Sequence, residues 1–197
     1  MARQPKPKQK NAAWLLALVA LFGLPALAKA GNGEDNVPGA DGTLPKAKDC
    51  RLPRGIRNNN PGNIRVSNAN YLGKIPLAQN TDYNCTTRQV EKKYEQFVSY
   101  AHGVRALVQL LISDIYYRQG AFSVQEILMK YPTSTSTDQV AYIISVAKQM
   151  GVPAQEALAS TENNIRALAK AIARFENGRD AITNAQYAAA LHIAPIG

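Results

Sequence analysis

The chain has 197 residues, of which 46% are hydrophobic and 19% are charged, a composition typical of one globular domain and not of a disordered chain. Of its 23 basic residues, five lie in residues 1–30, which hold no acidic residue, so the remainder has 18 basic against 14 acidic side chains. This mild positive balance suits acidic polymers such as those of the cell wall, and no basic, aromatic-rich stretch indicates nucleic acid. The two histidines and two cysteines have no metal-ligand spacing, so we expect no metal and no cofactor.

Residues 1–30 are typical of a secretory signal peptide, because a basic, proline-rich start precedes an apolar run and the sequence Ala28-Lys29-Ala30. The alternative is a retained inner-membrane anchor at residues 14–28, which is shorter than the roughly 20 residues that cross a bilayer. In both cases the rest of the chain is exported, to the periplasm or into a virion. With a signal peptide, contact with the membrane is only transient.

Residues 31–49 are rich in Gly, Pro, Asp and Asn, which predicts a flexible linker before a folded domain at residues 50–197. Export exposes Cys50 and Cys85 to an oxidising compartment, so we expect them to form a disulfide. Closing a loop of this length stabilises the fold by roughly 3–4 kcal/mol in the chain-entropy model.

Residues 54–65 read Arg-Gly-Ile-Arg-Asn-Asn-Asn-Pro-Gly-Asn-Ile-Arg, a run of turn formers that predicts neither a regular helix nor a strand. Pro61 and Gly62 suit the centre of a type II turn. The amides of this loop offer donors and acceptors to the hydroxyl and N-acetyl groups of a glycan. The alternative is that each amide bonds to its own backbone. The amides belong to Asn58, Asn59, Asn60 and Asn63.

The remaining pattern predicts a mainly α domain, with one short β-hairpin within residues 66–94. Helical spacing of apolar residues predicts helices near residues 104–115, 123–131, 138–150, 161–176 and 183–191. The apolar positions expected to face the core of the 138–150 helix are Val140, Ile143, Ile144, Ala147 and Met150.

Glu176 is the candidate catalytic acid, because it lies in the last turn of the 161–176 helix beside Phe175. The negative end of the helix dipole and nearby apolar surface both favour the protonated carboxyl group. A general acid for glycosidic cleavage needs such a raised pKa. Arg174 and Arg179 would oppose it if they point at the carboxylate. The alternative interpretation is a solvated glutamate at a helix end.

Over residues 54–178 the chain resembles a group of bacteriophage virion proteins described as structural proteins. The 54–65 motif is the specific part of this resemblance, and the later motifs follow in the same order. They include Gly103-Val-Arg-Ala-Leu, Tyr131-Pro132, Met150-Gly-Val and Glu176-Asn-Gly.

The same blocks resemble bacterial peptidoglycan glucosaminidases, in which the glutamate comes before the asparagine-rich loop instead of after it. This resemblance implies a circularly permuted, lysozyme-like helical domain with Glu176 as general acid. It implies that the loop at residues 58–63 binds sugar and that Tyr142 lies beside the cleft. We expect Tyr94, Tyr131 and Tyr142 to offer stacking surfaces to the sugars.

No second carboxylate stands at a motif position; Asp138, Glu95 and Asp180 are the remaining candidates. Lytic transglycosylases, by resemblance, need only one glutamate, whereas retaining and inverting glycosidases use two carboxylates.

We therefore expect an exported, phage-encoded peptidoglycan glycosidase of the lytic transglycosylase or muramidase/glucosaminidase type. Its expected partners are peptidoglycan glycan strands and virion or envelope proteins, and not nucleic acid. The alternative is a non-catalytic virion structural or wall-binding protein with a lysozyme-like fold.

Overall fold

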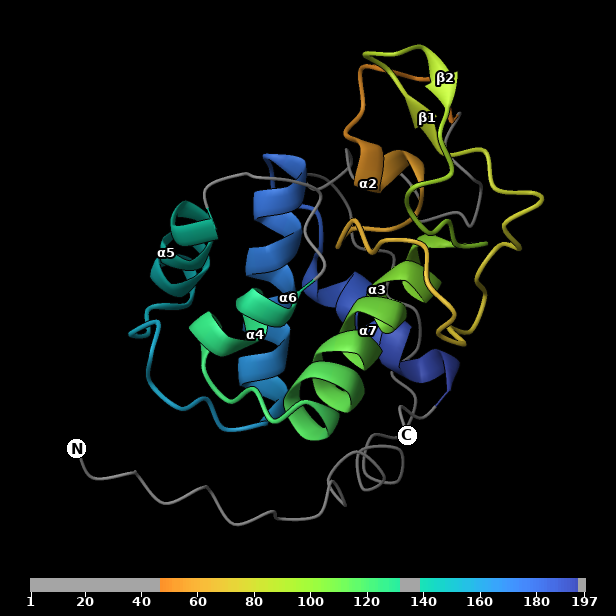
Figure 1. Ribbon diagram of the computed structural model, residues 1–197. Coiled ribbons are helices and arrows are strands. Elements are labelled where there is room, and N and C mark those ends of the chain that lie inside the picture. The colour runs from red at the N-terminus through yellow and green to blue at the C-terminus, as the bar shows by residue number, and fades with distance from the viewer. Residues whose placement is uncertain (1–46, 132–138, 195–197) are drawn as a thin grey trace, which may run out of the picture.

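The computed structural model describes residues 47–131 and 139–194 (Figure 1). The predicted signal peptide, the alternative anchor at residues 14–28 and the linker up to residue 46 lie outside the described residues, as does Asp138. Within the described part, no helix combines the length and the apolar character needed to cross a membrane.

The fold is mainly α with one small hairpin, as the sequence predicted. Ser99, Ser123, Thr161 and Thr183 each accept a hydrogen bond from a backbone N–H in the first turn of the helix they precede. The helical elements are α3 (Tyr100–Gln109), the π-helix η1 (Leu110–Arg118) that continues it, α4 (Val124–Lys130), α5 (Gln139–Met150), α6 (Glu162–Asn177) and α7 (Asn184–Ile193).

Helix α6 runs through the middle of the helical region, with α5 packed on one side and α3 on the other, while α7 packs against α3 (Figure 1). The core between them includes Leu107, Leu111, Ile165, Leu168 and Ile172, all buried at the spacing that predicted the helices. Gly178 adopts a left-handed conformation (φ 66°) and ends α6. The apolar pattern therefore determines which faces of α3 and α6 meet.

The buried face predicted for helix α5 is correct only in part: Ala147 is buried and Ile143 and Met150 pack partly buried against the core, but Val140 and Ile144 do not. Val140 and Ile144 are 63% and 58% exposed, whereas Tyr142, Val146 and Ala147 are buried. The apolar residues of this helix lie on more than one face, so periodicity alone did not identify the buried one. As a result, the ring of Tyr142 points into the protein.

A second region, at the upper right of Figure 1, holds the one-turn helix α2 (Arg54–Arg57) and the antiparallel strands β1 (Tyr83–Asn84) and β2 (Gln89–Val90). The expectation that residues 54–65 contain no helix is thus wrong for the first four. The predicted disulfide is confirmed: Cys50 and Cys85 are bonded and join the segment before α2 to the hairpin.

Candidate functional site

The asparagine-rich loop follows α2 directly. Asn59 (φ 52°) and Asn63 (φ 46°) take the left-handed conformation, which asparagine tolerates better than most residues. Gly62 does not, so the predicted type II conformation is wrong. A turn around Pro61 and Gly62 still forms, because the Asn63 N–H donates to the Asn60 carbonyl over 2.9 Å.

Three of the four predicted sugar-binding amides are completely buried and bonded inside the protein. Asn58 donates to Asp82 Oδ1 (2.8 Å) and accepts from the side chain of Gln96 (3.0 Å). Asn59 donates to the carbonyl of Phe97 (3.1 Å), and Asn60 bonds to backbone groups, as described below.

Asn60 makes the largest number of these contacts. It donates to the carbonyls of Ile64 (2.9 Å) and Glu95 (3.0 Å) and accepts from the Ile64 N–H (2.9 Å). Side chains with no exposed surface do not reach a ligand, so the structure contradicts a sugar-binding role for Asn58, Asn59 and Asn60. They fix the loop instead.

Asn63, the fourth amide, is only partly buried and lies against Glu176. Its Nδ2 donates to Glu176 Oε2 over 3.0 Å and to the Glu176 carbonyl over 3.3 Å. The fold therefore joins two side chains that are 113 positions apart in sequence, as the hypothesis of one shared site requires.

Burial raises the pKa of the Glu176 carboxyl group, in the direction expected from the sequence. Hydrogen bonding from Asn63 and interaction with Tyr142 oppose this shift. Arg174 does not add to the opposition, because its guanidinium pairs with Asp180 at 3.0 Å. Glu176 is thus a half-buried acid whose proton is held more tightly than that of an ordinary glutamate.

The ring of Tyr142 is buried (2% exposed) and stacks on Phe175, with 4.1 Å between the ring centroids. Its hydroxyl faces the Glu176 carboxyl group closely enough to affect its pKa, but outside hydrogen-bond geometry, and it has no partner in the described chain. Tyr142 therefore lies beside Glu176, with a hydroxyl that has unused hydrogen-bonding capacity.

The other two tyrosines are also buried. Tyr131 donates its hydroxyl to the Gly62 carbonyl over 2.6 Å, and the ring of Tyr94 lies under the guanidinium of Arg54, 4.5 Å from the ring centroid. Neither ring has a free face for a sugar, so the stacking role predicted for Tyr94, Tyr131 and the ring of Tyr142 is contradicted. Tyr131 instead holds the loop from the side of α4.

Asn177 and Gly55 belong to the site although neither was predicted to. Asn177 is buried and donates to the carbonyls of Pro61 (2.8 Å) and Ala173 (2.7 Å). A Cβ atom at position 55 would lie 2.6 Å from Asn177 Oδ1 and 3.0 Å from Asn63 Oδ1. The Glu-Asn-Gly sequence at the end of α6 was the available signal for Asn177; nothing local distinguishes Gly55.

The further carboxylate candidates do not face Glu176. Glu95 is 2% exposed and accepts from the Ser67 N–H and Lys74, and Asp180 pairs with Arg174. Among residues 47–131 and 139–194, no group of three or more potential metal ligands comes together. Among the described residues, the polar groups at Glu176 itself are therefore its carboxyl group, the Asn63 amide and the Tyr142 hydroxyl.

Comparison with known proteins connects the chain to a phage. It is similar to Protein P5 of Pseudoalteromonas phage PM2, with 27% identity over 133 residues, which cover 66% of this chain and 74% of that protein. No model of a known protein family matches the chain. The similarity agrees with the phage resemblance of the sequence motifs, and the name of that protein states no activity.

Proposed function

We propose that the chain is an exported, phage-encoded enzyme that cleaves the glycan strands of peptidoglycan, with Glu176 as its general acid. The observation that carries this proposal is the half-buried Glu176 carboxyl group, with its raised pKa, held at 3.0 Å by Asn63 from the opposite region of the fold. The Cys50–Cys85 disulfide agrees with an oxidising compartment such as the periplasm.

The described residues bring one carboxyl group to the site, which favours a lytic transglycosylase mechanism. Glu176 gives its proton to the glycosidic oxygen as the bond to the anomeric carbon breaks. The resulting carboxylate then takes the proton of a hydroxyl group of the same sugar, whose oxygen attacks the anomeric carbon and closes an intramolecular ring. No water is consumed, and Glu176 regains its proton.

Asn63 and Tyr142 have supporting roles in this mechanism. The Asn63 amide fixes the Oε2 atom of Glu176, so that Oε1 remains for the glycosidic oxygen. The partnerless Tyr142 hydroxyl can donate to the carboxylate when the proton has left. Both roles require the two groups to stay in place while the charge on Glu176 changes.

The test uses the mature chain, residues 31–197, on purified peptidoglycan, with release of soluble fragments as the measurement. Glu176→Gln should lower the rate by about 10²–10⁴-fold, the range for loss of a general acid–base group. Glu156→Gln, which changes an exposed glutamate, should leave it unchanged. Retention of full activity by Glu176→Gln would disprove the assignment.

The reaction type is read from the products. Cleavage in ¹⁸O-labelled water should give fragments without the label and lighter by one water than the hydrolysis product. Incorporation of ¹⁸O would instead identify a muramidase or glucosaminidase, which transfers the sugar to water.

The second candidate function is a non-catalytic wall-binding or virion structural protein. The observation that favours it is that three asparagines and three tyrosine rings of the expected cleft are buried within the protein. Under this proposal the wild-type chain sediments with insoluble peptidoglycan, releases no fragments, and binds equally well with Glu176→Gln. Virion or envelope proteins would then be its partners.

A further inference from the structure

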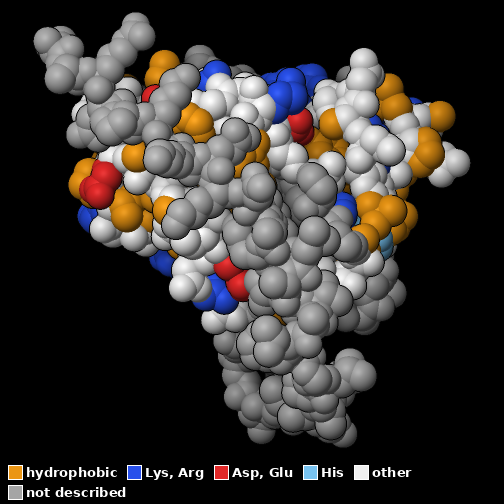
Figure 2. Space-filling model, turned by 90° about the horizontal axis from the view of Figure 1, so that it is seen from below, with side chains coloured by type: hydrophobic (Ala, Val, Ile, Leu, Met, Phe, Trp, Pro, Cys, Tyr) orange, Lys and Arg blue, Asp and Glu red, His pale blue; other side chains and the backbone are white. Residues whose placement is uncertain are grey.

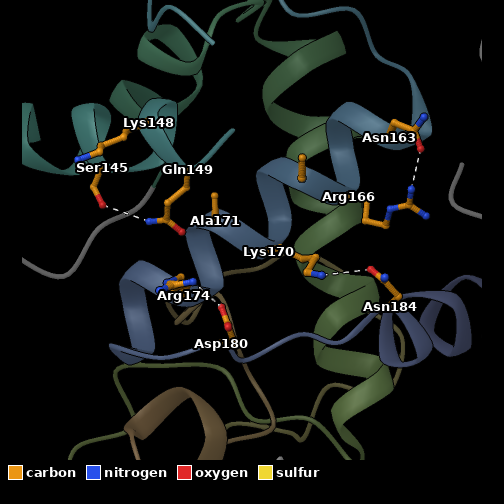
Figure 3. A pocket seen from close by; sticks show the side chains of 11 residues that line it. Ser145, Lys148, Gln149, Asn163, Arg166, Lys170, Ala171, Arg174, Asp180 and Asn184 are labelled. Carbon is orange, nitrogen blue, oxygen red and sulfur yellow. Dashed lines mark hydrogen bonds and ion pairs between the residues drawn. The ribbon is translucent and has the colours of Figure 1, made fainter. Parts of the chain in front are cut away.

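A surface groove of 810 Å³ lies between α5 and α6, away from Glu176 (Figure 3). Ser145, Lys148 and Gln149 enter it from α5 and Lys170 from α6. On α6 the side chains of residues 174 and 176 point about 160° apart, because successive residues turn by about 100°. The groove is therefore a separate site on the other face of the helix that carries Glu176.

The groove has more cations than anions. Among the described residues its charged lining consists of four cations and one anion, Asp180, which pairs with Arg174, while Arg166 pairs with Glu162 outside the lining over 3.7 Å. No ion pair involves Lys148 or Lys170 within the described residues, and the Lys170 ammonium donates only to Asn184 Oδ1 (3.1 Å). On the face shown in Figure 2, Lys and Arg lie in several separate places, some of them beside Asp or Glu. The four cations are Lys148, Arg166, Lys170 and Arg174.

The spacing of the cations suits an extended chain of anionic groups. Arg166, Lys170 and Arg174 stand at every fourth position of α6, with a rise of about 6 Å per step. Alternate residues of an extended peptide repeat at about 6.6 Å. Arginine forks and lysine ammonium groups both bind carboxylates.

The uncharged lining favours a peptide over a nucleic acid. It offers the hydroxyl of Ser145 and the amides of Gln149, Asn163 and Asn184, whose remaining donors and acceptors can pair with peptide C=O and N–H groups. No aromatic side chain lines the groove in the part of the chain that the structure describes, whereas single-stranded nucleic acids are held by stacking of bases on aromatic rings.

We propose that this groove binds short acidic peptides, and that its natural ligands are the carboxylate-bearing peptide stems of peptidoglycan; the choice of stem peptides rests on the proposed function. The groove would hold a stem while Glu176, on the other face of α6, acts on a glycan strand. It is an anchoring site and takes no part in the cleavage step.

The experiment measures binding to the mature chain by calorimetry, with a disaccharide-tetrapeptide muropeptide as the probe. Lys148→Gln/Lys170→Gln should weaken binding tenfold or more. Arg88→Gln/Lys130→Gln, which removes the same charge from exposed positions elsewhere, should change the affinity less than twofold. The same muropeptide with its carboxyl groups amidated should lose binding to the wild type.

Equal losses of muropeptide affinity in both double variants would overturn the proposal, and so would unchanged affinity for the amidated muropeptide. The third contrary result is that a 20-nucleotide single-stranded DNA, or phosphatidylglycerol vesicles, bind more tightly than the muropeptide and lose that binding in Lys148→Gln/Lys170→Gln. Glu176→Gln should bind the muropeptide as the wild type does. Groove binding and glycan cleavage can thus fail independently of each other.

Discussion

The two ends of the asparagine-rich loop use the same side chain for different purposes. Asn58, Asn59 and Asn60 are fully buried and bonded to residues 24–38 positions later or to nearby backbone, while Asn63 is partly exposed and bonded to Glu176. The first three hold the loop rigid, so that the fourth can hold a carboxyl group. Chemical type therefore does not assign function within this loop; burial does.

The largest expected effect on stability comes from the disulfide next to the rigid end of the loop, which is Asn58, Asn59 and Asn60. Replacing Cys50 and Cys85 together by serine should lower the free energy of unfolding by roughly 3–4 kcal/mol, because the unfolded chain loses the constraint of a loop closed over 35 positions. Urea unfolding measures this. The Asn63–Glu176 contact involves neither cysteine, so glycan cleavage at low temperature should persist; its loss would show that both ends depend on the bond.

Asn60→Ala tests the rigid end directly. It removes three hydrogen bonds and takes away the Asn60 partner of the Ile64 N–H and of the Glu95 carbonyl, while the Ile64 carbonyl keeps the Glu95 N–H, and this should cost about 3 kcal/mol. Asn70→Ala, at an exposed asparagine, should cost less than about 0.5 kcal/mol. Equal costs in urea unfolding would contradict the structural role of the buried amides.

Asn63→Ala tests the other end. It should cost only about 1 kcal/mol of stability, since one partly exposed hydrogen-bonding group is lost, but it should lower glycan cleavage by about tenfold. Because the Asn63 amide lowers the pKa of Glu176, the alkaline limb of the pH–rate profile should move to higher pH. An unshifted profile would mean that the contact does not act on the carboxyl group.

The smallest expected effect is on the stability of Glu176→Gln. The pKa of Glu176 is raised on folding, so the native state binds its proton more tightly than the unfolded state does. This contribution is present below the unfolded pKa and is lost as the pH rises through the folded pKa. Glutamine does not ionise, so the variant should melt at or above the wild-type temperature at pH 7, with a smaller difference at pH 4. The description of Glu176 as a buried acid would be contradicted if the melting temperature of the variant minus that of the wild type were lower at pH 7 than at pH 4.

Much of the scaffold could be predicted from the sequence. The apolar spacing of Leu107, Leu111, Leu168 and Ile172 identified the buried faces of α3 and α6, and the predicted starts of α4, α6 and α7 lie within a residue of the observed ones, whereas α3 begins at Tyr100 instead of near residue 104. The disulfide followed from compartment and composition. These features depend on local pattern or on general chemistry, so no knowledge of distant neighbours is needed.

Whether each asparagine and tyrosine is buried, and what it contacts, could not be predicted, because this depends on residues far away in sequence. Asn58 is buried because Asp82 and Gln96 meet it, and the ring of Tyr142 is buried because it stacks on Phe175, which belongs to a different helix. The contact between Asn63 and Glu176 could be proposed only from the resemblance, since 113 residues separate them.

Gly55 has a genetic consequence. Three oxygen atoms, from Asn60, Asn63 and Asn177, occupy the space in which even an alanine methyl group would have to fit. Any missense change at this codon introduces a side chain and displaces the amide that touches Glu176. A screen of randomly mutated clones for full-length, disulfide-bonded protein that no longer lyses cell walls should therefore recover position 55, although glycine contributes no reactive group.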